Sequence, residues 1–478
     1  MSKTHLPKDT SASRRDFLKK GALAASAIVT GVGAESASGV TRTQYIAPIP
    51  KSSVLGAADR LRVGFIGVGG QGFNAHVRTV SNMDGKGNTH HEFDYNAVGV
   101  AACDLYTGNR DRAGALLENA RSSRDLGDYK VETYEDHRRM IDRDDIDVIF
   151  IGTVDHWHAQ VAIDALESGK HVYCEKPMTR YLPEAFDVYD AVKRTGMKFQ
   201  VGSQFCTEGK WHVAHEMIKA GKVGPLVTLQ NSYTRNSPSG EWNYYEMKKD
   251  VTPDTLDWNH WLGNVHDRPD FNVEHWARWR KFLPYCAGIL GDLLAHRIHP
   301  LIIAAGATEF PKRVVCLGNH NITIAQLGPD DRSVTDNTQL IAEYPSGHSM
   351  VILGSTVNEQ GLPQVIRGQE ATMYFGDGTI ELRPERPFAD LVDPELIENI
   401  TPGPSIPAHV DNLFSSIRND VAPNGNIEVA IRAQTMISMA EMSERLGEMV
   451  YFDEETRQMS TGSGRKLDTL SYGSLSPS

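Results

Sequence analysis

Lys176, Asp292 and His296 are residues whose types and spacing could move a proton during oxidation of an alcohol. Lys176 ends the apolar stretch at 172–176, and Pro177 holds it in an extended conformation while stopping the strand. Asp292 and His296 are four positions apart, so in a helix they would share a face, and the carboxylate could fix the imidazole tautomer. A histidine that titrates near neutrality suits a general base. The spacing alone also fits an ordinary pair on a helix surface.

A glycine-rich turn follows directly on the apolar strand at 61–67 and opens a helical stretch. Such a turn is tight, lets a pyrophosphate approach the backbone and presents it to a helix N-terminus. The candidate cofactor-binding residues of this turn are Gly67, Gly69, Gly70, Gln71 and Gly72.

A second apolar strand at 97–104 ends in Asp104, which could accept hydrogen bonds from the adenosine ribose. It lies 32 positions after Gly72 rather than about 20, because a polar insertion at 81–96 precedes the strand. A carboxylate repels a 2′-phosphate, so NAD is expected and NADP is less favoured. A strand-end cap is the alternative role for Asp104.

Strands and helices alternate through this half, with further strands at 147–154 and 171–176 and a helix at about 156–168. This alternation predicts a parallel, doubly wound sheet. Ligands of such sheets lie beyond the carboxyl ends of the strands. The candidate residues at these strand ends are Gly67, Asp104, Thr153, Glu175 and Lys176.

The motifs GVGGQG, TVDHWHAQVAIDALESGKHVYCEKPMT and GILGDLLAHRIHPL together resemble the glucose-fructose oxidoreductase, inositol dehydrogenase and rhizopine catabolism (Gfo/Idh/MocA) family. The likeness runs from about 60 to 450. It implies a nucleotide-binding Rossmann domain and a C-terminal α/β domain with a large, mostly antiparallel open sheet that supports homo-oligomers. It also implies that Lys176 hydrogen-bonds the reacting oxygen, and only His158 of the Asp-His-Trp-His run matches a recurrent family position.

The second half contains the remaining candidates. Arg235, Asn236, Tyr285 and His299 are candidate sugar contacts, whereas the tryptophans at 258, 261, 276 and 279 are expected mainly in the core, with a carbohydrate-stacking wall as the alternative. A metal site of Asp292, His296 and His299 is disfavoured, because three residues within eight positions do not easily converge. No metal is expected.

Alternating stretches such as 225–235 predict further strands, and helices are expected at about 182–195, 409–418 and 427–446. We therefore expect a Rossmann domain at 61–178, a substrate and oligomerisation domain at 179–452 and a C-terminal tail at 453–478.

The N-terminus predicts export. Residues 1–40 combine paired arginines at 14 and 15 with a short run of small apolar residues, which resembles a twin-arginine signal peptide. An extended arm at 41–60 follows. We expect a periplasmic or secreted protein that uses the twin-arginine export machinery and has no stable membrane insertion. A net charge of −12 argues against nucleic acid as a partner, and five scattered cysteines do not form a disulfide framework.

Two enzyme classes remain open. The first is an NAD(P)-dependent oxidoreductase that transfers hydride between a hydroxyl carbon of a sugar or cyclic polyol and a tightly bound nicotinamide cofactor. The second is an NAD-dependent glycosidase, known in the family, which oxidises the sugar transiently and returns the cofactor unchanged.

Overall fold

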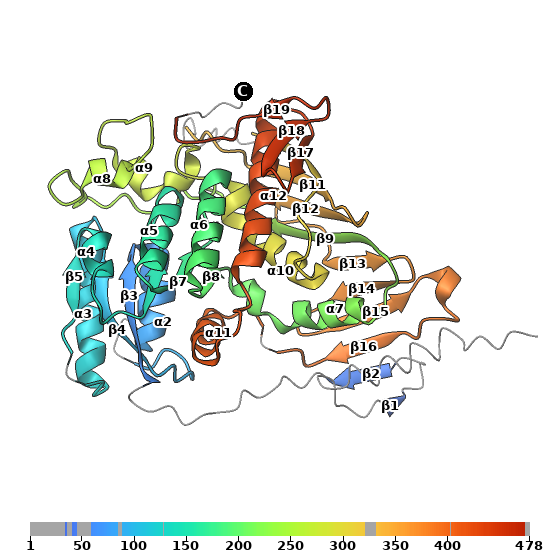
Figure 1. The fold of residues 1–478 in the computed structure, drawn as a ribbon, viewed down its shortest axis with the longest axis horizontal. Helices are drawn as coiled ribbons and strands as arrows, with labels where there is room; N and C mark the ends of the chain where they lie inside the picture. Colours follow the sequence, from blue (N-terminus) through green and yellow to red (C-terminus); the bar gives the residue numbers. More distant parts are fainter. Residues whose placement is uncertain are drawn as a thin grey trace, which may run out of the picture.

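The computed structural model describes residues 34–35, 41–44, 59–84, 88–127, 129–320, 331–401 and 403–473. Most of the signal peptide expected at 1–40 therefore lies outside the described residues. The described chain forms two sheets, with the Rossmann half on the left of Figure 1 and the larger sheet on the right. None of the described helices is long and apolar enough to cross a membrane.

The first sheet is parallel and has six strands in the order β5-β4-β3-β6-β7-β8. The order reverses between β3 and β6, so the chain leaves a crevice at the carboxyl ends of these two strands. The strands are β3 (Leu61–Ile66), β4 (Ala97–Cys103), β5 (Glu132–Tyr134), β6 (Val148–Ile151), β7 (His171–Glu175) and β8 (Phe199–Gly202).

Helices cover both faces of this sheet, which explains why β4, β6 and β8 are buried along their whole lengths. One face packs against η2, α2, α3 and α11, and the other against α4, α5 and α6. The helices are η2 (Gly72–Val77), α2 (Arg78–Ser81), α3 (Thr107–Ser123), α4 (His137–Ile141), α5 (Asp155–Glu167), α6 (Leu182–Thr195) and α11 (Ile406–Asn419).

The second sheet has thirteen strands and is mostly antiparallel, with two parallel pairs, β9 with β12 and β2 with β16. The α/β fold class predicted from the sequence is confirmed. In sheet order the strands are β1 (Ala34–Glu35), β2 (Thr41–Gln44), β16 (Glu395–Glu398), β15 (Ile380–Pro384), β14 (Ala371–Phe375), β13 (Val365–Gly368), β9 (Leu226–Thr234), β12 (Ser349–Ser355), β11 (Asn337–Glu343), β10 (Arg313–Asn319), β17 (Val450–Asp453), β18 (Gln458–Thr461) and β19 (Lys466–Leu467).

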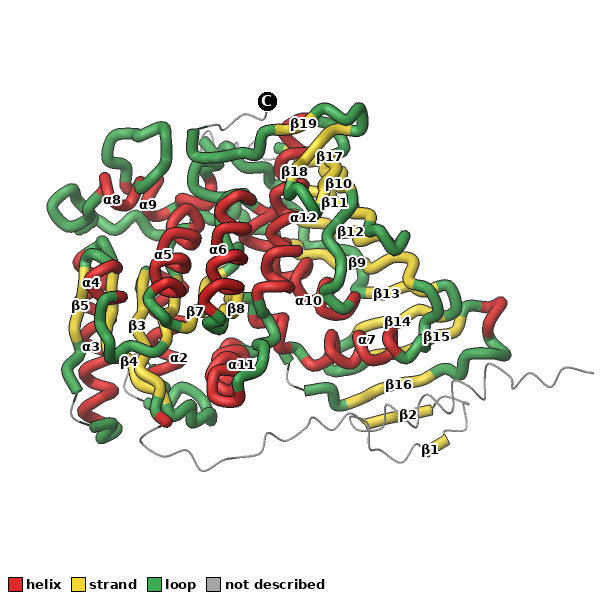
Figure 2. Tube along the Cα trace, viewed as in Figure 1, coloured by secondary structure: helices red, strands yellow, loops and turns green. Residues whose placement is uncertain are grey.

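Helices cover one face of the large sheet, and α12 stands between the two sheets in Figure 2. On the other face, apolar side chains of β10 and β11 stay exposed. The covering helices are α7 (Gly209–Lys219), α10 (Ala295–Ala305) and α12 (Ile427–Leu446); shorter helical turns are η3 (Gln204–Thr207), α8 (Trp258–Leu262), α9 (Val273–Ala277), η4 (Trp279–Lys281), η5 (Leu290–Leu294) and η6 (Arg386–Phe388).

Three segments differ from the expected domain limits. The Rossmann sheet continues past residue 178, because β8 pairs with β7 along four residues. The expected tail also joins the large sheet through β18 and β19. Within the expected arm at 41–60, Thr41–Gln44 pairs with β16 at the edge of the large sheet.

Candidate active site

A cavity of about 600 Å³ lies between the carboxyl ends of the Rossmann strands and the segment 235–293 of the second half. This segment leaves β9 and carries α8, α9 and η4, and Figure 1 shows α8 and α9 over the Rossmann half. Two contacts hold the segment there: the amide of Thr107 donates to the Thr255 carbonyl at 3.0 Å, and the Trp157 indole donates to the Trp261 carbonyl at 3.0 Å. Both halves of the chain therefore build the walls of the cavity.

The glycine turn lines the cavity where it meets the carboxyl end of β3. Gly67 has φ +76°, and a Cβ there would lie 2.5 Å from the Thr153 amide nitrogen. A Cβ on Gly72 would lie 1.9 Å from the Gly67 carbonyl oxygen, so this glycine lets the helix approach the strand. At Gly70 a Cβ would meet nothing within 4 Å. Gly67, Gly69, Gly70 and Gln71 line the cavity and leave the open cradle that a pyrophosphate requires, so the residues present fit a dinucleotide.

Asp104 ends β4 at the same edge of the sheet. Its two carboxylate oxygens accept from the Val68 and Tyr106 amides, each at 2.9 Å. Burial raises the pKa of Asp104 to about 6, although these hydrogen bonds and Arg112 favour its ionised form. Asp104 lines the cavity as predicted, yet both its oxygens also cap the turn, so the capping alternative holds at the same time.

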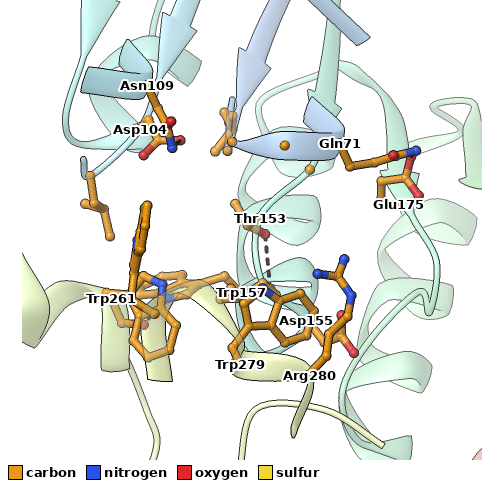
Figure 3. Close-up of a pocket in the computed structure, with 18 of the residues that line it drawn as sticks. Gln71, Asp104, Asn109, Thr153, Asp155, Trp157, Glu175, Trp261, Trp279 and Arg280 are labelled. Atoms are coloured by element: carbon orange, nitrogen blue, oxygen red, sulfur yellow. Dashed lines mark hydrogen bonds between the residues drawn. The ribbon is translucent and has the colours of Figure 1, made fainter. Parts of the chain in front are cut away.

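Glu175 and His158 are buried residues that line the crevice. Glu175 is buried, but His76 at 3.0 Å, Lys176 and Gln71 at 3.2 Å outweigh the burial and lower its pKa. The Gln71 side chain is thereby fixed to the end of β7 (Figure 3). His158 lies 2.7 Å from the Pro177 carbonyl and 3.3 Å from that of Thr153, and burial lowers its pKa to about 4. A neutral His158 has one N–H donor, so it can bond only one of these two carbonyls, of which that of Pro177 is the nearer.

Lys176 and Asp292 meet where the two halves of the chain join. The Lys176 ammonium donates to Asp292 Oδ1 and to the Asp292 carbonyl oxygen, both at 2.6 Å. Arg280 Nε donates to the same Oδ1 at 3.1 Å, and the Trp242 indole donates to Oδ2 at 3.0 Å. Burial opposes ionisation, but Lys176, Arg280 and Trp242 hold the pKa of Asp292 well below its usual range. Asp292 is thus a fixed anion that orients Lys176.

No hydrogen bond joins the side chains of the predicted dyad, Asp292 and His296, in the described structure, although the charge of Asp292 acts on His296. The turn at Leu290–Leu294 is a π-helix rather than the expected α-helix. His296 Nδ1 instead lies 3.4 Å from the Ser203 hydroxyl. Burial and the charge of Lys176 lower the pKa of His296 well below its ordinary value. Among the described residues that line the cavity, His296 is absent.

Of the candidate sugar contacts, only Arg235 lines the cavity, where it donates to Glu241 at 3.0 Å and to the Tyr233 hydroxyl at 2.7 Å. The structure places the other three elsewhere. Asn236 forms a β-bridge with Val357, the buried Tyr285 hydroxyl lies 2.7 Å from His275 Nδ1, and His299 Nδ1 lies 2.6 Å from the Ala295 carbonyl. No group of three metal-binding side chains occurs in the part of the chain that the structure describes.

The tryptophans pack in or against the core, as expected, and most of them also line the cavity. Trp261, Trp276 and Trp279 line the cavity together with Trp157, and only Trp258 lies behind, stacked on Trp261 at 4.7 Å. Figure 3 shows Trp157, Trp261 and Trp279 on the side opposite Asp104. Core packing and the aromatic wall therefore both describe these residues. Spacing could not distinguish the two, because these residues are mostly buried as well as cavity-lining.

Sequence reasoning assigned no role to three further residues at the site. Arg280 and Asp155 line the cavity next to Lys176, and Trp242 holds Asp292 from behind. Asp155 was visible only as part of the Asp-His-Trp-His run. Trp242 has φ +66°, a conformation that a bulky residue rarely adopts, and nothing in the sequence signals it.

Curated proteins with known names resemble part of this chain in sequence. Curated relatives include a glycosyl hydrolase family 109 protein from Shewanella sp. (strain W3-18-1), 29% identical over 247 residues, covering 48% of this chain and 50% of that protein. An alpha-N-acetylgalactosaminidase from Shewanella oneidensis is 29% identical over 249 residues, with the same coverage. The chain spans about half the length of these relatives.

Solved structures share the fold at low identity. Levoglucosan dehydrogenase in complex with NADH and levoglucosan has a TM-score of 0.58 at 19% identity, covering 82% of this chain and 99% of that one. The aldose-aldose oxidoreductase from Caulobacter crescentus, complexed with glycerol, has a TM-score of 0.58 at 16% identity, covering 82% and 100%.

Family profiles match nearly the whole described chain. Residues 61–203 match the oxidoreductase family with an NAD-binding Rossmann fold, which agrees with the expectation of NAD as cofactor. Residues 217–466, more than half of the chain, match the C-terminal alpha/beta domain of the same family. The chain therefore belongs to the Gfo/Idh/MocA oxidoreductase family.

Proposed function

We propose that this protein is an NAD-dependent oxidoreductase that moves a hydride between a hydroxyl-bearing carbon of a sugar or cyclic polyol and a tightly bound nicotinamide cofactor. The observation that carries the proposal is the Lys176 ammonium, held at the junction of the nucleotide crevice and the second half by two contacts of 2.6 Å to Asp292. A fixed cation at this position suits an oxygen that becomes more negative as its carbon is oxidised.

The geometry determines how many N–H donors of Lys176 remain for a ligand. An ammonium group has three N–H donors, and among the described residues two of them are directed at Asp292. The third is free to bond a substrate oxygen in the cavity. NAD, when bound, supplies the hydride acceptor. The chain's own contribution is to orient the substrate oxygen, to keep Asp292 ionised beneath Lys176 and to limit access of water.

The aromatic wall supports a cyclic carbohydrate as substrate. Trp157, Trp261 and Trp279 present flat apolar surfaces in the same cavity as Lys176 and Arg280. Sugars and cyclic polyols have an apolar C–H face and a polar rim, which match this combination of rings and charged donors.

A transient-oxidation glycosidase is the second candidate. The curated relatives named glycosyl hydrolase family 109 protein and alpha-N-acetylgalactosaminidase favour it. Both candidates use the same Lys176 contact, and they differ in whether reduced cofactor accumulates.

One experiment tests both. Protein purified without added nucleotide is denatured and the released nucleotide is identified; NAD at near one per chain is expected. The native protein is then mixed with sugars, cyclic polyols and nitrophenyl glycosides. Persistent NADH absorbance supports the dehydrogenase, and release of nitrophenol without net NADH supports the glycosidase. A chain without nucleotide that changes none of these compounds contradicts both.

We also propose export and self-association. Residues 1–40 would act as a twin-arginine signal, giving a periplasmic or secreted product, which fusion of these residues to a reporter would test. Leu317 and Ile341, 57% and 48% exposed on the uncovered face of the large sheet, support a homo-oligomer. Light scattering at micromolar concentration would measure its mass, and a monomer would contradict self-association.

A further inference from the structure

Two carboxylates, Asp155 and Asp292, face the same part of the cavity as Lys176 and Arg280. Their surroundings differ. Asp292 accepts hydrogen bonds from Lys176, Arg280 and Trp242, which fix it as an anion. Asp155 opens helix α5, where the first turn contains no other acidic residue.

Asp155 is a buried polar group without a partner. Its relative exposure is 4%, and within the described structure its carboxylate makes no hydrogen bond. Buried carboxylates are nearly always hydrogen-bonded, so one that lines a cavity unpaired has capacity left for a ligand. Figure 3 shows the Asp155 side chain beside Arg280, on the side of the cavity away from Asp104.

Charged side chains from several elements affect the pKa of Asp155. Arg280 from η4, Lys176 from the end of β7 and Arg180 favour its ionised form, and Asp292 from η5 disfavours it. Burial is the largest effect and raises the pKa of Asp155 to about 7, whereas the pKa of Asp292 is held well below its usual range. Two carboxyl groups of one cavity whose pKa values are pushed apart in this way form the usual pattern of an acid–base group beside a permanent anion.

We propose that Asp155 is the catalytic proton acceptor of this site, taking the hydroxyl proton of the carbohydrate while Lys176 binds the same oxygen. This rests on the proposed oxidoreductase function. In the oxidation direction the carbinol C–H bond breaks with its electron pair passing to NAD⁺. The O–H bond breaks with its proton passing to an Asp155 carboxylate oxygen, which leaves a ketone, NADH and neutral Asp155. The reverse direction returns the same proton.

The other candidates fit this role less well. Lys176 already donates twice to Asp292, to its Oδ1 and to its carbonyl oxygen. His296 lies outside the residues that line the cavity, and its ring nitrogen is directed at Ser203. Asp155 combines cavity access with a free carboxylate.

The test is Asp155→Asn, which keeps the shape and removes the proton-accepting oxygen. Once the wild-type protein is shown to reduce NAD with a polyol, the variant is expected to lose about 100-fold or more in kcat with bound NAD unchanged. The wild-type rise of kcat/KM through pH 7 should disappear. Asp164→Asn, on the same helix, is the matched control: Asp164 bonds His137 and Gln160, lies outside the cavity lining, and its variant should keep the wild-type pH profile.

A readout independent of turnover is the pH dependence of unfolding. A carboxyl whose folded pKa is raised stabilises the fold below its unfolded pKa, and this stability is lost as the pH rises through about 7. The Tm of Asp155→Asn relative to wild type should therefore increase between pH 5 and pH 8. For Asp164→Asn the difference should stay level over this range, because hydrogen bonds from His137 and Gln160 outweigh burial and lower the pKa of Asp164, so this carboxyl is ionised in both the folded and the unfolded chain above pH 5.

Two results would overturn the assignment: Asp155→Asn with kcat within threefold of wild type, or a slow variant that keeps the rise through pH 7. If the Asn variant does not fold, Asp155→Glu replaces it, and a pH profile identical to wild type then counts against Asp155. Failure of the wild-type protein to act on any polyol is a separate result that contradicts the proposed function instead.

Discussion

The two walls of the cavity are built in opposite ways. The Rossmann wall consists of strand ends and their first turns, so Gly67, Asp104 and Lys176 follow directly from short stretches of sequence. The facing wall comes from the segment between β9 and η5, in which α8, α9 and η4 have only five, five and three residues. Its side chains are placed by contacts between distant positions rather than by regular elements.

This difference separates two properties of the enzyme. The Rossmann wall recognises a part of the cofactor that is the same in every reaction, and backbone geometry suffices for it. The facing wall supplies Trp261, Trp279 and Arg280, which line the cavity and, on the proposed function, would contact the substrate. We therefore expect substitutions in the first wall to change nucleotide binding and those in the second to change turnover or sugar selectivity.

Lys176 follows strand β7 of the Rossmann wall, but its ammonium contacts Asp292 in the second half of the chain. Its substitution has the largest expected effect. Lys176→Met removes the ammonium that binds the substrate oxygen and should lower kcat at least about 100-fold. The nucleotide released on denaturation should remain near one per chain, because the glycine turn is unchanged.

Lys170→Met is a suitable control for Lys176. Lys170 is also a buried lysine, 8% exposed, and donates to the Arg143 carbonyl at 2.8 Å, outside the cavity lining. Its substitution should leave kcat unchanged even where it lowers Tm. Comparable turnover in the two variants would remove Lys176 from the mechanism.

The elements with strong local signals could be predicted from the sequence. The helices expected at 182–195 and 427–446 coincide with α6 and α12, because long periodic stretches carry their own signal. The glycine turn also occupies the predicted position, because the backbone conformation demands glycine at Gly67 and the close approach of helix and strand demands it at Gly72.

Two features of the site could not be predicted. The turn at Leu290–Leu294, which contains Asp292, is π-helical, yet its residues are as compatible with an α-helix. The contact of Trp242 with Asp292 joins positions 50 residues apart, so no local pattern contains it. Both belong to the facing wall or to its junction with Lys176, where tertiary contacts decide the geometry.

Substitution of Trp242 tests whether the facing wall acts by positioning Asp292. Trp242 is fully buried, and its indole N–H is the hydrogen-bond donor to Asp292 Oδ2 at 3.0 Å. Trp242→Phe keeps an aromatic ring and removes this donor. A hydrogen bond to a charged group is worth about 1.5–3 kcal/mol, so kcat should fall about tenfold or somewhat more, with bound NAD unchanged.

Trp211→Phe is the matched comparison for Trp242. Trp211 is equally buried and donates its indole N–H to Glu208 Oε2 at 2.7 Å, away from the cavity lining. Both variants lose an indole–carboxylate hydrogen bond and should lose similar stability, but only Trp242→Phe should slow turnover. Equal kcat values would mean that Trp242 has a structural role alone.

Asp104 gives the smallest and most specific effect, and it tests whether the Rossmann wall recognises the ribose or only caps a turn. Burial raises the pKa of Asp104 to about 6, so a carboxylate that accepts ribose hydroxyls should weaken NAD binding as the pH falls below 6 and the group protonates. Asp104→Asn should weaken binding several-fold at pH 8, reduce discrimination against NADP and remove the pH dependence. Calorimetric titration of nucleotide-free protein between pH 5 and pH 8 measures all three.

Asp147→Asn, which breaks only a contact to Arg62 at the opposite end of the sheet, should keep the wild-type dependence. If wild-type affinity does not change over this range, Asp104 serves the Val68 and Tyr106 amides alone, and the nucleotide is held by the glycine turn without help from the strand end.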